Sequence, residues 1–279
     1  MEKWEICETE CFEYLKKNYA NSKYTFELDG KHNSTISDIL LKKHGIATFY
    51  IESKMPSAQC GQFVVLQNDN LKKFYYSPKN LYAENMQSKF IIEFMNDNFD
   101  FYKNPGTKGK KIELEEDFFF DWIYHFYSNK NVKYFIREKE LGKISSDNFI
   151  IFPFQRLKKY VHANAIYRTK KSGSSNPNKN DFEDIITAAK SEGFEVLHIF
   201  QQNNYIFVQL NVNVNAVPMV YMLNGENHKY QFKLVENNIF KVTKLSNTCN
   251  ANVIFDISLI QNAKQDKKDL QTFEGEFRY

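Results

Sequence analysis

Apolar and polar residues recur with two different periods in the N-terminal part of the chain. One stripe of residues at helical spacing predicts an amphipathic helix over residues 4–18 that packs on a sheet. The stripe consists of Trp4, Cys7, Cys11, Tyr14 and Leu15. Residues 24–28 (YTFEL) alternate as a strand does, and the Asp29-Gly30 pair after them signals a hairpin turn. Residues 46–51 form a largely apolar run that is typical of a buried central strand. The pattern predicts a helix followed by three strands.

The next stretch predicts a second helix and a fourth strand. Pro56 ends the third strand and Ser57 suits a helix N-cap, so we expect a helix over residues 58–67 and a strand at residues 74–76. Residues 83–101 and 114–127 have apolar residues at intervals of three and four. They predict helices of the core or of a dimer interface in preference to surfaces that stack on bases.

The C-terminal part of the chain changes character. Residues 181–192 predict a helix capped by Asp181. Strand-like runs follow at residues 194–200, 205–214, 217–223, 230–235 and 240–245. The expected fold class is therefore mixed α+β, with a helical middle and a β-rich C-terminal lobe.

Three charged residues stand out against the apolar strands. Glu52 and Lys54 lie two apart on the third strand, so their side chains share one face. The turn-like KKHG at residues 42–45 folds the strand that begins at Asp38 back beside them. Two carboxylates and an ammonium would form a site for a hard cation such as Mg²⁺, which prefers oxygen ligands. A bound metal lowers the pKa of its water, and the lysine can orient or deprotonate the nucleophile.

The order Asp, thirteen residues, Glu-Ser-Lys resembles the motif of the PD-(D/E)xK nuclease family, with Ser37 in the place of the proline. The resemblance covers residues 1–77 and implies a core of helix, three-stranded meander, helix and strand. It implies that Asp38 and Glu52 hold Mg²⁺ and that Lys54 positions or activates the attacking water. The alternative for these residues is a solvated strand face with an incidental ion pair.

The resemblance also singles out two further residues. In this family an acid from the first helix sometimes approaches the metal, and Glu8 borders the apolar stripe of that helix. Many members carry a polar residue in the helix after the lysine that touches the metal-bound water or a phosphate, which here favours Gln62. The alternatives are an ordinary exposed helix acid and a helix start that happens to be polar.

The charge of one stretch of the chain favours nucleic-acid binding, but the net charge of the whole chain does not. The net charge of the 279 residues is +3, which is weak for a nucleic-acid binder, but no acid occurs from Asn148 to Asn180. Such a stretch favours the phosphate backbone, with binding that weakens steeply as salt rises. The expected DNA contacts are Arg156, Lys158, Lys159, Arg168, Lys170, Lys171, Ser172 and Ser174. A surface linker between two lobes is the alternative for this stretch.

The cysteines and the hydropathy of the chain bear on disulfide bonds, metal binding and cellular location. The chain has four cysteines, Cys7, Cys11, Cys60 and Cys249, too few and too scattered for a disulfide framework. Cys7 and Cys11 lie one helical turn apart and could begin a metal site. No Cys or His pair at ligand spacing accompanies them, so packing as small apolar residues is favoured. No signal peptide or membrane-spanning run is expected, and we predict a cytoplasmic protein.

Together these observations predict a Mg²⁺-dependent endonuclease that cuts double-stranded DNA and resembles a type II restriction enzyme. Residues 1–147 would form the catalytic core with helical additions, residues 148–180 a DNA-contacting linker or loop, and residues 181–279 a lobe for DNA recognition. Cutting both strands of a palindrome suits a two-fold symmetric homodimer. The alternatives are another nuclease of the family (a junction resolvase, a repair enzyme or a transposon end-cutting enzyme) and a non-catalytic DNA-binding protein on the same fold.

Overall fold

The computed structural model describes residues 3–30, 36–140, 142–143, 146–171, 174–212, 219–246 and 249–277. It separates into two compact units, the first formed by residues 1–168 with residues 251–279 and the second by residues 169–250. Unit 1 contains two five-stranded sheets and unit 2 contains one. Within the described ranges, no helix combines the length and the apolar character needed to cross a bilayer.

The first sheet of unit 1 has a parallel pair of strands at its centre. Its strands, in spatial order, are β1 (Tyr24–Leu28), β2 (Ile39–Lys43), β3 (Ile46–Lys54), β7 (Val132–Glu138) and β8 (Phe149–Pro153). The strands β1, β2 and β3 form the predicted antiparallel meander, whereas β3 and β7 are parallel. A parallel neighbour needs a long crossover, and here the chain between β3 and β7 supplies α4 and three strands of the second sheet, β4, β5 and β6.

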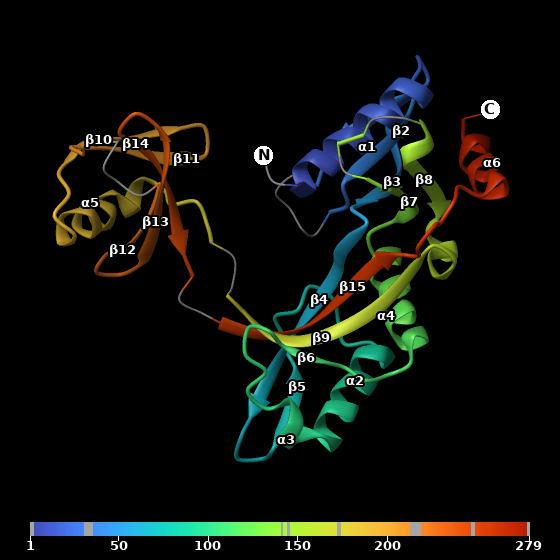
Figure 1. The fold of residues 1–279 in the computed structure, drawn as a ribbon, viewed down its shortest axis with the longest axis horizontal. Helices are drawn as coiled ribbons and strands as arrows, with labels where there is room; N and C mark the ends of the chain where they lie inside the picture. Colours follow the sequence, from blue (N-terminus) through green and yellow to red (C-terminus); the bar gives the residue numbers. More distant parts are fainter. Residues whose placement is uncertain are drawn as a thin grey trace. The chain divides into compact units, whose positions relative to one another are not determined.

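Helices cover both faces of this sheet (Figure 1). On one face, α1 (Lys3–Tyr19) and α6 (Lys267–Gly275) bury residues such as Leu15 and Phe273 against Ile51 and Tyr134. On the other face, α4 (Glu116–Ser128) packs against Phe135. The predicted first helix is confirmed, because its apolar stripe is the buried face of α1.

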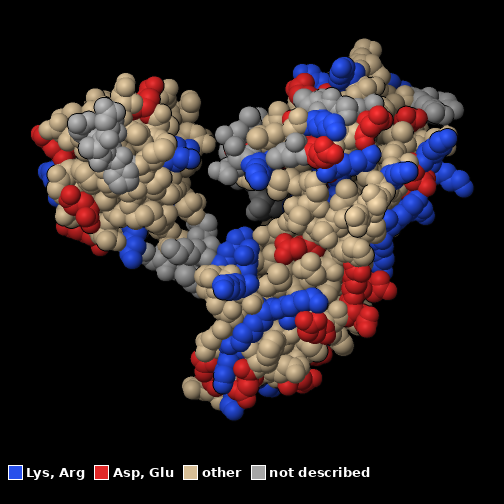
Figure 2. Space-filling view, in the orientation of Figure 1, with Lys and Arg blue, Asp and Glu red and all other residues tan. Residues whose placement is uncertain are grey.

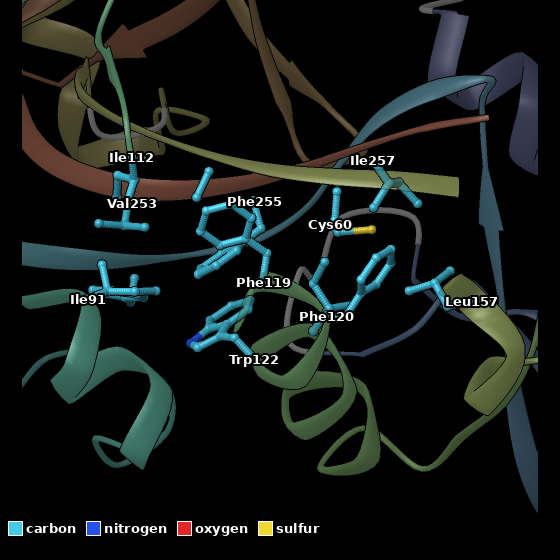
Figure 3. Packing of buried hydrophobic residues seen from close by; sticks show 14 of the residues in the cluster. Cys60, Ile91, Ile112, Phe119, Phe120, Trp122, Leu157, Val253, Phe255 and Ile257 are labelled. Atoms are coloured by element: carbon cyan, nitrogen blue, oxygen red, sulfur yellow. The ribbon is translucent and has the colours of Figure 1, made fainter. Parts of the chain in front are cut away.

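The second sheet of unit 1 shares a core with α4. Its strands, in spatial order, are β5 (Lys73–Tyr76), β4 (Ser57–Asn68), β15 (Cys249–Leu259), β9 (Val161–Lys171) and β6 (Lys110–Lys111). Two helices, α2 (Met86–Asp97) and α3 (Phe99–Tyr102), pack beside it. Trp122 of α4 stacks on Phe255 of β15 with ring centroids 3.9 Å apart, next to Ile91 of α2 and Cys60 of β4 (Figure 3). Three 3₁₀ helices connect the elements: η1 (Ser146–Asn148), η2 (Phe154–Lys159) and, in unit 2, η3 (Lys179–Asp181).

The predicted helix over residues 58–67 is wrong, because this segment is strand β4. A register shift at Gly61, opposite β15, places an extra residue in β4, so Cys60 and Phe63 are both buried although they lie three apart. That spacing imitates helical periodicity. The fourth predicted strand is confirmed as β5, but it belongs to the second sheet, and β7 is the strand that lies beside β3.

Unit 2 is an antiparallel sheet covered on one face by a helix. Its strands, in spatial order, are β10 (Val196–Gln202), β11 (Tyr205–Leu210), β14 (Ile239–Leu245), β13 (Lys229–Glu236) and β12 (Val220–Asn224). The helix α5 (Phe182–Ser191) buries Ile185 and Ala188 against them. These elements match the predicted helix and the five strand-like runs, with shifted ends. The Asp181 side chain does not cap α5 as predicted, since it accepts from Asn178 N at 2.9 Å and from Lys244 Nζ at 2.6 Å.

The division of the chain differs from the three predicted ranges. Residues 148–168 are not a linker, because β8, η2 and most of β9 are built into the sheets of unit 1. Residues 251–279 return from unit 2 to unit 1, where β15 pairs with β4 and α6 packs on the first sheet. The β-rich lobe is therefore shorter at its C-terminal end than residues 181–279.

Candidate active site

The three motif residues meet at one end of the first sheet. Glu52 and Lys54 extend from β3, and Asp38 immediately precedes β2. The Lys54 ammonium lies 2.5 Å from Glu52 Oε1 and 3.9 Å from Asp38 Oδ2. Asp38 Oδ2 also accepts hydrogen bonds from Ser53 N at 2.9 Å and Ser53 Oγ at 3.0 Å. The fold thus brings both carboxylates to one lysine, as the sequence predicts.

Burial and mutual charge set the protonation of this cluster. Burial and the neighbouring Glu52 raise the pKa of Asp38 to about 6. Burial alone would raise the pKa of Glu52, but the ammonium groups of Lys54 and Lys130 hold it below its usual value. Burial would lower the pKa of Lys54, yet the two carboxylates outweigh it and raise that pKa. Lys54 is therefore a firmly charged ammonium in the metal-free site.

Glu8 reaches the same cluster from α1. Its side chain is half-buried, and the pKa of its carboxyl is raised to about 8 by burial and by the nearby Asp38 carboxylate. Glu52 adds to this effect, while Lys54 opposes it. The structure therefore places a third carboxyl group close to the two predicted ligands.

One oxygen of the cluster has no hydrogen bond from any residue that the structure describes. Glu52 is 4% exposed and its Oε2 atom is buried, whereas Oε1 accepts from two donors. The buried Ser37 hydroxyl lies near enough to help lower the pKa of Glu52. A buried carboxylate oxygen without a donor is costly. A divalent cation held by Glu52, Asp38 and Glu8 would satisfy it, and an all-oxygen donor set suits Mg²⁺. The residues present therefore fit the expected metal.

Two residues of the site, one in the last turn of α4 and one just beyond it, were missed by sequence reasoning. The Tyr127 hydroxyl donates to Glu52 Oε1 at 3.0 Å, and the residue is 2% exposed. Burial lowers the pKa of Lys130, which lies close enough to Glu52 to stabilise its charge and 3.5 Å from the Ile36 carbonyl oxygen. The apolar periodicity of residues 114–127 indicated only a core helix. No local signal links that helix to a strand so far away in the sequence.

Gln62 occupies a different setting from the predicted one. It lies on strand β4, is exposed, and its Oε1 accepts from Gln59 Nε2 at 3.0 Å. Its neighbours in a small cavity include Tyr76, Trp122 and His125. The helix start that motivated its selection is absent, so a catalytic role for Gln62 remains only a prediction from the family.

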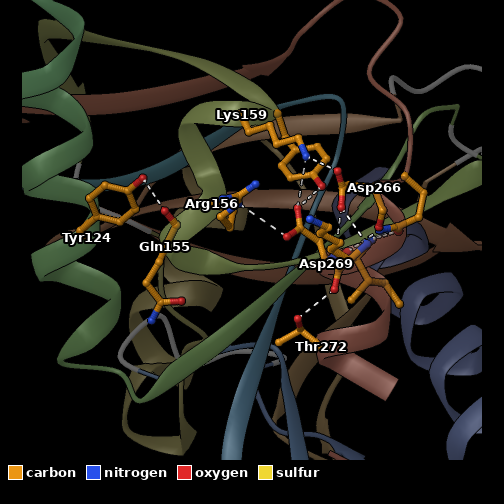
Figure 4. Close-up of polar contacts among 11 residues, drawn as sticks. Tyr124, Gln155, Arg156, Lys159, Asp266, Asp269 and Thr272 are labelled. Atoms are coloured by element: carbon orange, nitrogen blue, oxygen red, sulfur yellow. Dashed lines mark hydrogen bonds and ion pairs between the residues drawn. The ribbon is translucent and has the colours of Figure 1, made fainter. Parts of the chain in front are cut away.

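Acids from other parts of unit 1 meet three of the predicted DNA-contacting residues, and Figure 4 shows two of them, Arg156 and Lys159. Arg156 Nε lies 3.6 Å from Asp269, and Lys159 Nζ lies 2.5 Å from Asp266 at the start of α6. Lys158 Nζ lies 2.7 Å from Asp117 of α4. The stretch without acids in the sequence is therefore not free of acids in space, and part of its positive charge is neutralised within the fold.

The remaining predicted contacts lie at or beyond the end of β9. Arg168 and Lys170 are half-buried residues of this strand, and Ser174 is exposed. The Lys171 side chain and Ser172 lie outside the described residues. Lys and Arg side chains gather over the part of unit 1 where β6 and β9 run (Figure 2). DNA contact by these residues remains a prediction.

Comparison with known proteins gives one informative result. No protein-family model matches the chain, and no curated protein matches it. Among solved structures, the chain is similar to HhaI endonuclease, solved in complex with DNA, with 37% sequence identity and a TM-score of 0.81. The similarity covers 100% of this chain and 100% of that chain. Because this identity extends over the full length of both chains, the chain belongs to the family of HhaI endonuclease.

Proposed function

We propose that the protein is a Mg²⁺-dependent endonuclease that cuts double-stranded DNA at a specific sequence, as a type II restriction enzyme does. The observation that carries the proposal is the cluster of Asp38, Glu52 and Lys54, with a buried oxygen on Glu52 that has no hydrogen bond from any described residue. The similarity to an endonuclease that was solved with DNA supports the same activity and the same partner. Such an enzyme would act in the cytoplasm, where its DNA substrate enters.

The chain's own residues divide the chemistry between them. Asp38 and Glu52 would hold Mg²⁺, with Glu8 as a third carboxylate. The bound ion would lower the pKa of the attacking water and offset charge that develops on phosphorus. Lys54 is a charged ammonium in the metal-free site, where it would position the attacking water and stabilise the developing negative charge. Lys54 could also activate the water, because a bound cation would offset the carboxylates that raise the pKa of Lys54. The products would carry 5′-phosphate and 3′-hydroxyl ends.

Tyr127 and Lys130 act on the site through Glu52. The Tyr127 hydroxyl and the Lys54 ammonium both hold Glu52 Oε1, which leaves Oε2 free to face a metal. Partners of this kind fix the orientation of a ligating carboxylate. We assign Tyr127 and Lys130 to positioning, since neither donates a ligand of its own.

Digestion of a long unmodified viral DNA tests the proposal. The wild-type protein is incubated with and without Mg²⁺, beside the Lys54→Ala variant, and the fragment ends are sequenced. Discrete fragments with one shared sequence at every end, absent without metal and absent in the variant, would support it. Intact DNA that is nevertheless bound equally by both proteins would favour the non-catalytic DNA-binding alternative, and cleavage of branched DNA alone would favour a resolvase-like nuclease.

The number of chains in the active enzyme remains a prediction. One chain of 33.1 kDa carries one cluster of motif residues, and one such cluster serves one strand at a time. Cutting both strands therefore needs a second copy or a second binding event, and we keep the expected homodimer. Light scattering on the complex with DNA tests it, since a single chain on the cut duplex would contradict a dimer.

A further inference from the structure

A second cluster of ligand-type side chains lies between α1 and β7. Cys7 and Cys11 extend from one face of α1, and Glu138 is the last residue of β7. The three residues are 2%, 0% and 0% exposed. Their two sulfur atoms and a carboxylate oxygen all lie within 4.8 Å of one another. The pairing partner that the two cysteines lack in the sequence is thus supplied by a distant strand.

Glu138 is an unusual core residue, because a carboxyl group is fully buried there. Among the described residues neither of its oxygens has a donor that satisfies it, and a polar group that interacts with it is another carboxyl group, that of Glu10. Burial raises the pKa of Glu138 to about 9, and Cys7 and Glu10 add to the effect. A buried carboxylate without donors is costly, and it persists where a proton or a cation neutralises it. Two thiol sulfurs beside it are donors that a cation would use.

We propose that Cys7, Cys11 and Glu138 bind a zinc ion. Thiolate ligands select Zn²⁺ over Mg²⁺, which prefers oxygen ligands and keeps its waters. Tetrahedral Zn²⁺ with Zn–S of about 2.3 Å and Zn–O of about 2.0–2.2 Å holds its ligand atoms roughly 3.3–3.8 Å apart. The Glu10 carboxyl group interacts with Glu138 and could supply the fourth ligand, although its Oε2 atom accepts a hydrogen bond from Gly142 N at 3.1 Å.

The proposed zinc site differs from the Mg²⁺ site in its ligands and in its role. Zinc held by two residues of α1 and one of β7 would tie the helix to the sheet. Glu8 follows Cys7 directly, so the same tie would fix the helical turn that brings Glu8 to Asp38 and Glu52. The role would be structural, because all three ligand residues are buried away from solvent.

Cobalt substitution of the full chain provides the test, with a readout that does not depend on DNA cleavage. Metal-free protein titrated with Co²⁺ should show a thiolate-to-cobalt charge-transfer band with one equivalent bound, and Zn²⁺ should abolish the band. Protein purified without chelators should contain zinc by mass spectrometry. Cys60→Ser is the matched control, since Cys60 is also a buried thiol but lies in the other core cluster, and it should keep the band.

Cys7→Ser and Cys11→Ser should each lose the band. Glu138→Gln keeps the side-chain volume and both sulfurs, so it should keep thiolate absorption with at least tenfold weaker Co²⁺ affinity. Absence of the band in wild-type protein would overturn the proposal, as would an equal band in the Cys7→Ser variant. If circular dichroism shows that the cysteine variants do not fold, unchanged Co²⁺ affinity in Glu138→Gln overturns it instead. None of these outcomes bears on the proposed nuclease activity.

Discussion

Removal of the Tyr127 hydroxyl should raise the Mg²⁺ concentration that cleavage requires, although no metal ligand is removed. This hydroxyl donates to Glu52 Oε1 at 3.0 Å inside a buried site, where water cannot readily replace it. A hydrogen bond to a charged group is worth about 1.5–3 kcal/mol. At about 1.4 kcal/mol per tenfold, Tyr127→Phe should raise the Mg²⁺ concentration for half-maximal cleavage by about 10- to 100-fold. Lys54 still holds the same oxygen, so the loss is partial and saturating Mg²⁺ should restore most of the rate.

The assay is single-turnover cleavage of one DNA duplex across a Mg²⁺ titration. Tyr124→Phe is the matched control, because Tyr124 lies on the same helix and donates to the Gln155 carbonyl oxygen at 3.2 Å, away from Glu52 (Figure 4). The control curve should coincide with that of the wild type. A Tyr127→Phe curve that also coincides with the wild type would refute the assignment of Tyr127 as a positioning residue.

Three further predictions address charge, pH and stability. Lys130→Met removes a cation from the site, so it should slow cleavage about tenfold, which corresponds to about 1.4 kcal/mol of activation free energy. Lys17→Met changes an exposed lysine and should leave the cleavage rate unchanged. Glu8 binds its proton more tightly in the folded protein than in the unfolded chain, so the metal-free protein should lose stability as pH rises from 4.5 through about 8. In the Glu8→Gln variant the melting temperature should depend less on pH over that range. Asp269→Asn should lower the free energy of unfolding by about 1.5–3 kcal/mol, because the Tyr160 hydroxyl donates a buried hydrogen bond to the charged Asp269 carboxylate. This loss corresponds to about 2–4 °C of melting temperature per kcal/mol. Asp266→Asn keeps a competent helix cap and should lower the stability less.

Each of these has a clear contrary result. Equal cleavage rates for the two lysine variants would remove Lys130 from the site. A melting curve of the Glu8→Gln variant with the same pH slope as the wild type would show that Glu8 does not keep its proton. Equal melting temperatures for the two aspartate variants would show that the buried hydrogen bonds of Asp269 do not hold α6.

Local patterns predicted those parts of the structure that depend on local interactions. The helix α1 and the meander β1–β3 follow from periodicity and turn residues, and the motif residues follow from their alternation on β3. The strands β7 and β8 were not predicted, since their burial on both faces leaves no alternation to detect. β4 was mistaken for a helix because Pro56 and Ser57 resemble a strand end followed by a helix N-cap, whereas Ser57 is the first residue of the next strand.

Long-range contacts account for what the sequence could not show. Tyr127 forms a hydrogen bond with Glu52 although strands β4, β5 and β6 lie between them in the sequence. Glu138, at the end of β7, lies beside the two cysteines of α1. In the same way, Asp266 and Asp269 neutralise part of a stretch that contains no acid of its own. Sequence spacing alone reveals none of these pairs, because each depends on which strands become neighbours.

The most direct test of the proposed activity compares cleavage and binding of the same DNA by wild type and three variants. Asp38→Asn, Glu52→Gln and Lys54→Ala should each abolish Mg²⁺-dependent cleavage while DNA binding persists. Glu27→Gln changes an acid of β1 that pairs only with Lys42 among the contacts described for it, at 2.6 Å, and should cut as the wild type does. Cleavage retained by any of the three variants would contradict the assignment of the active site.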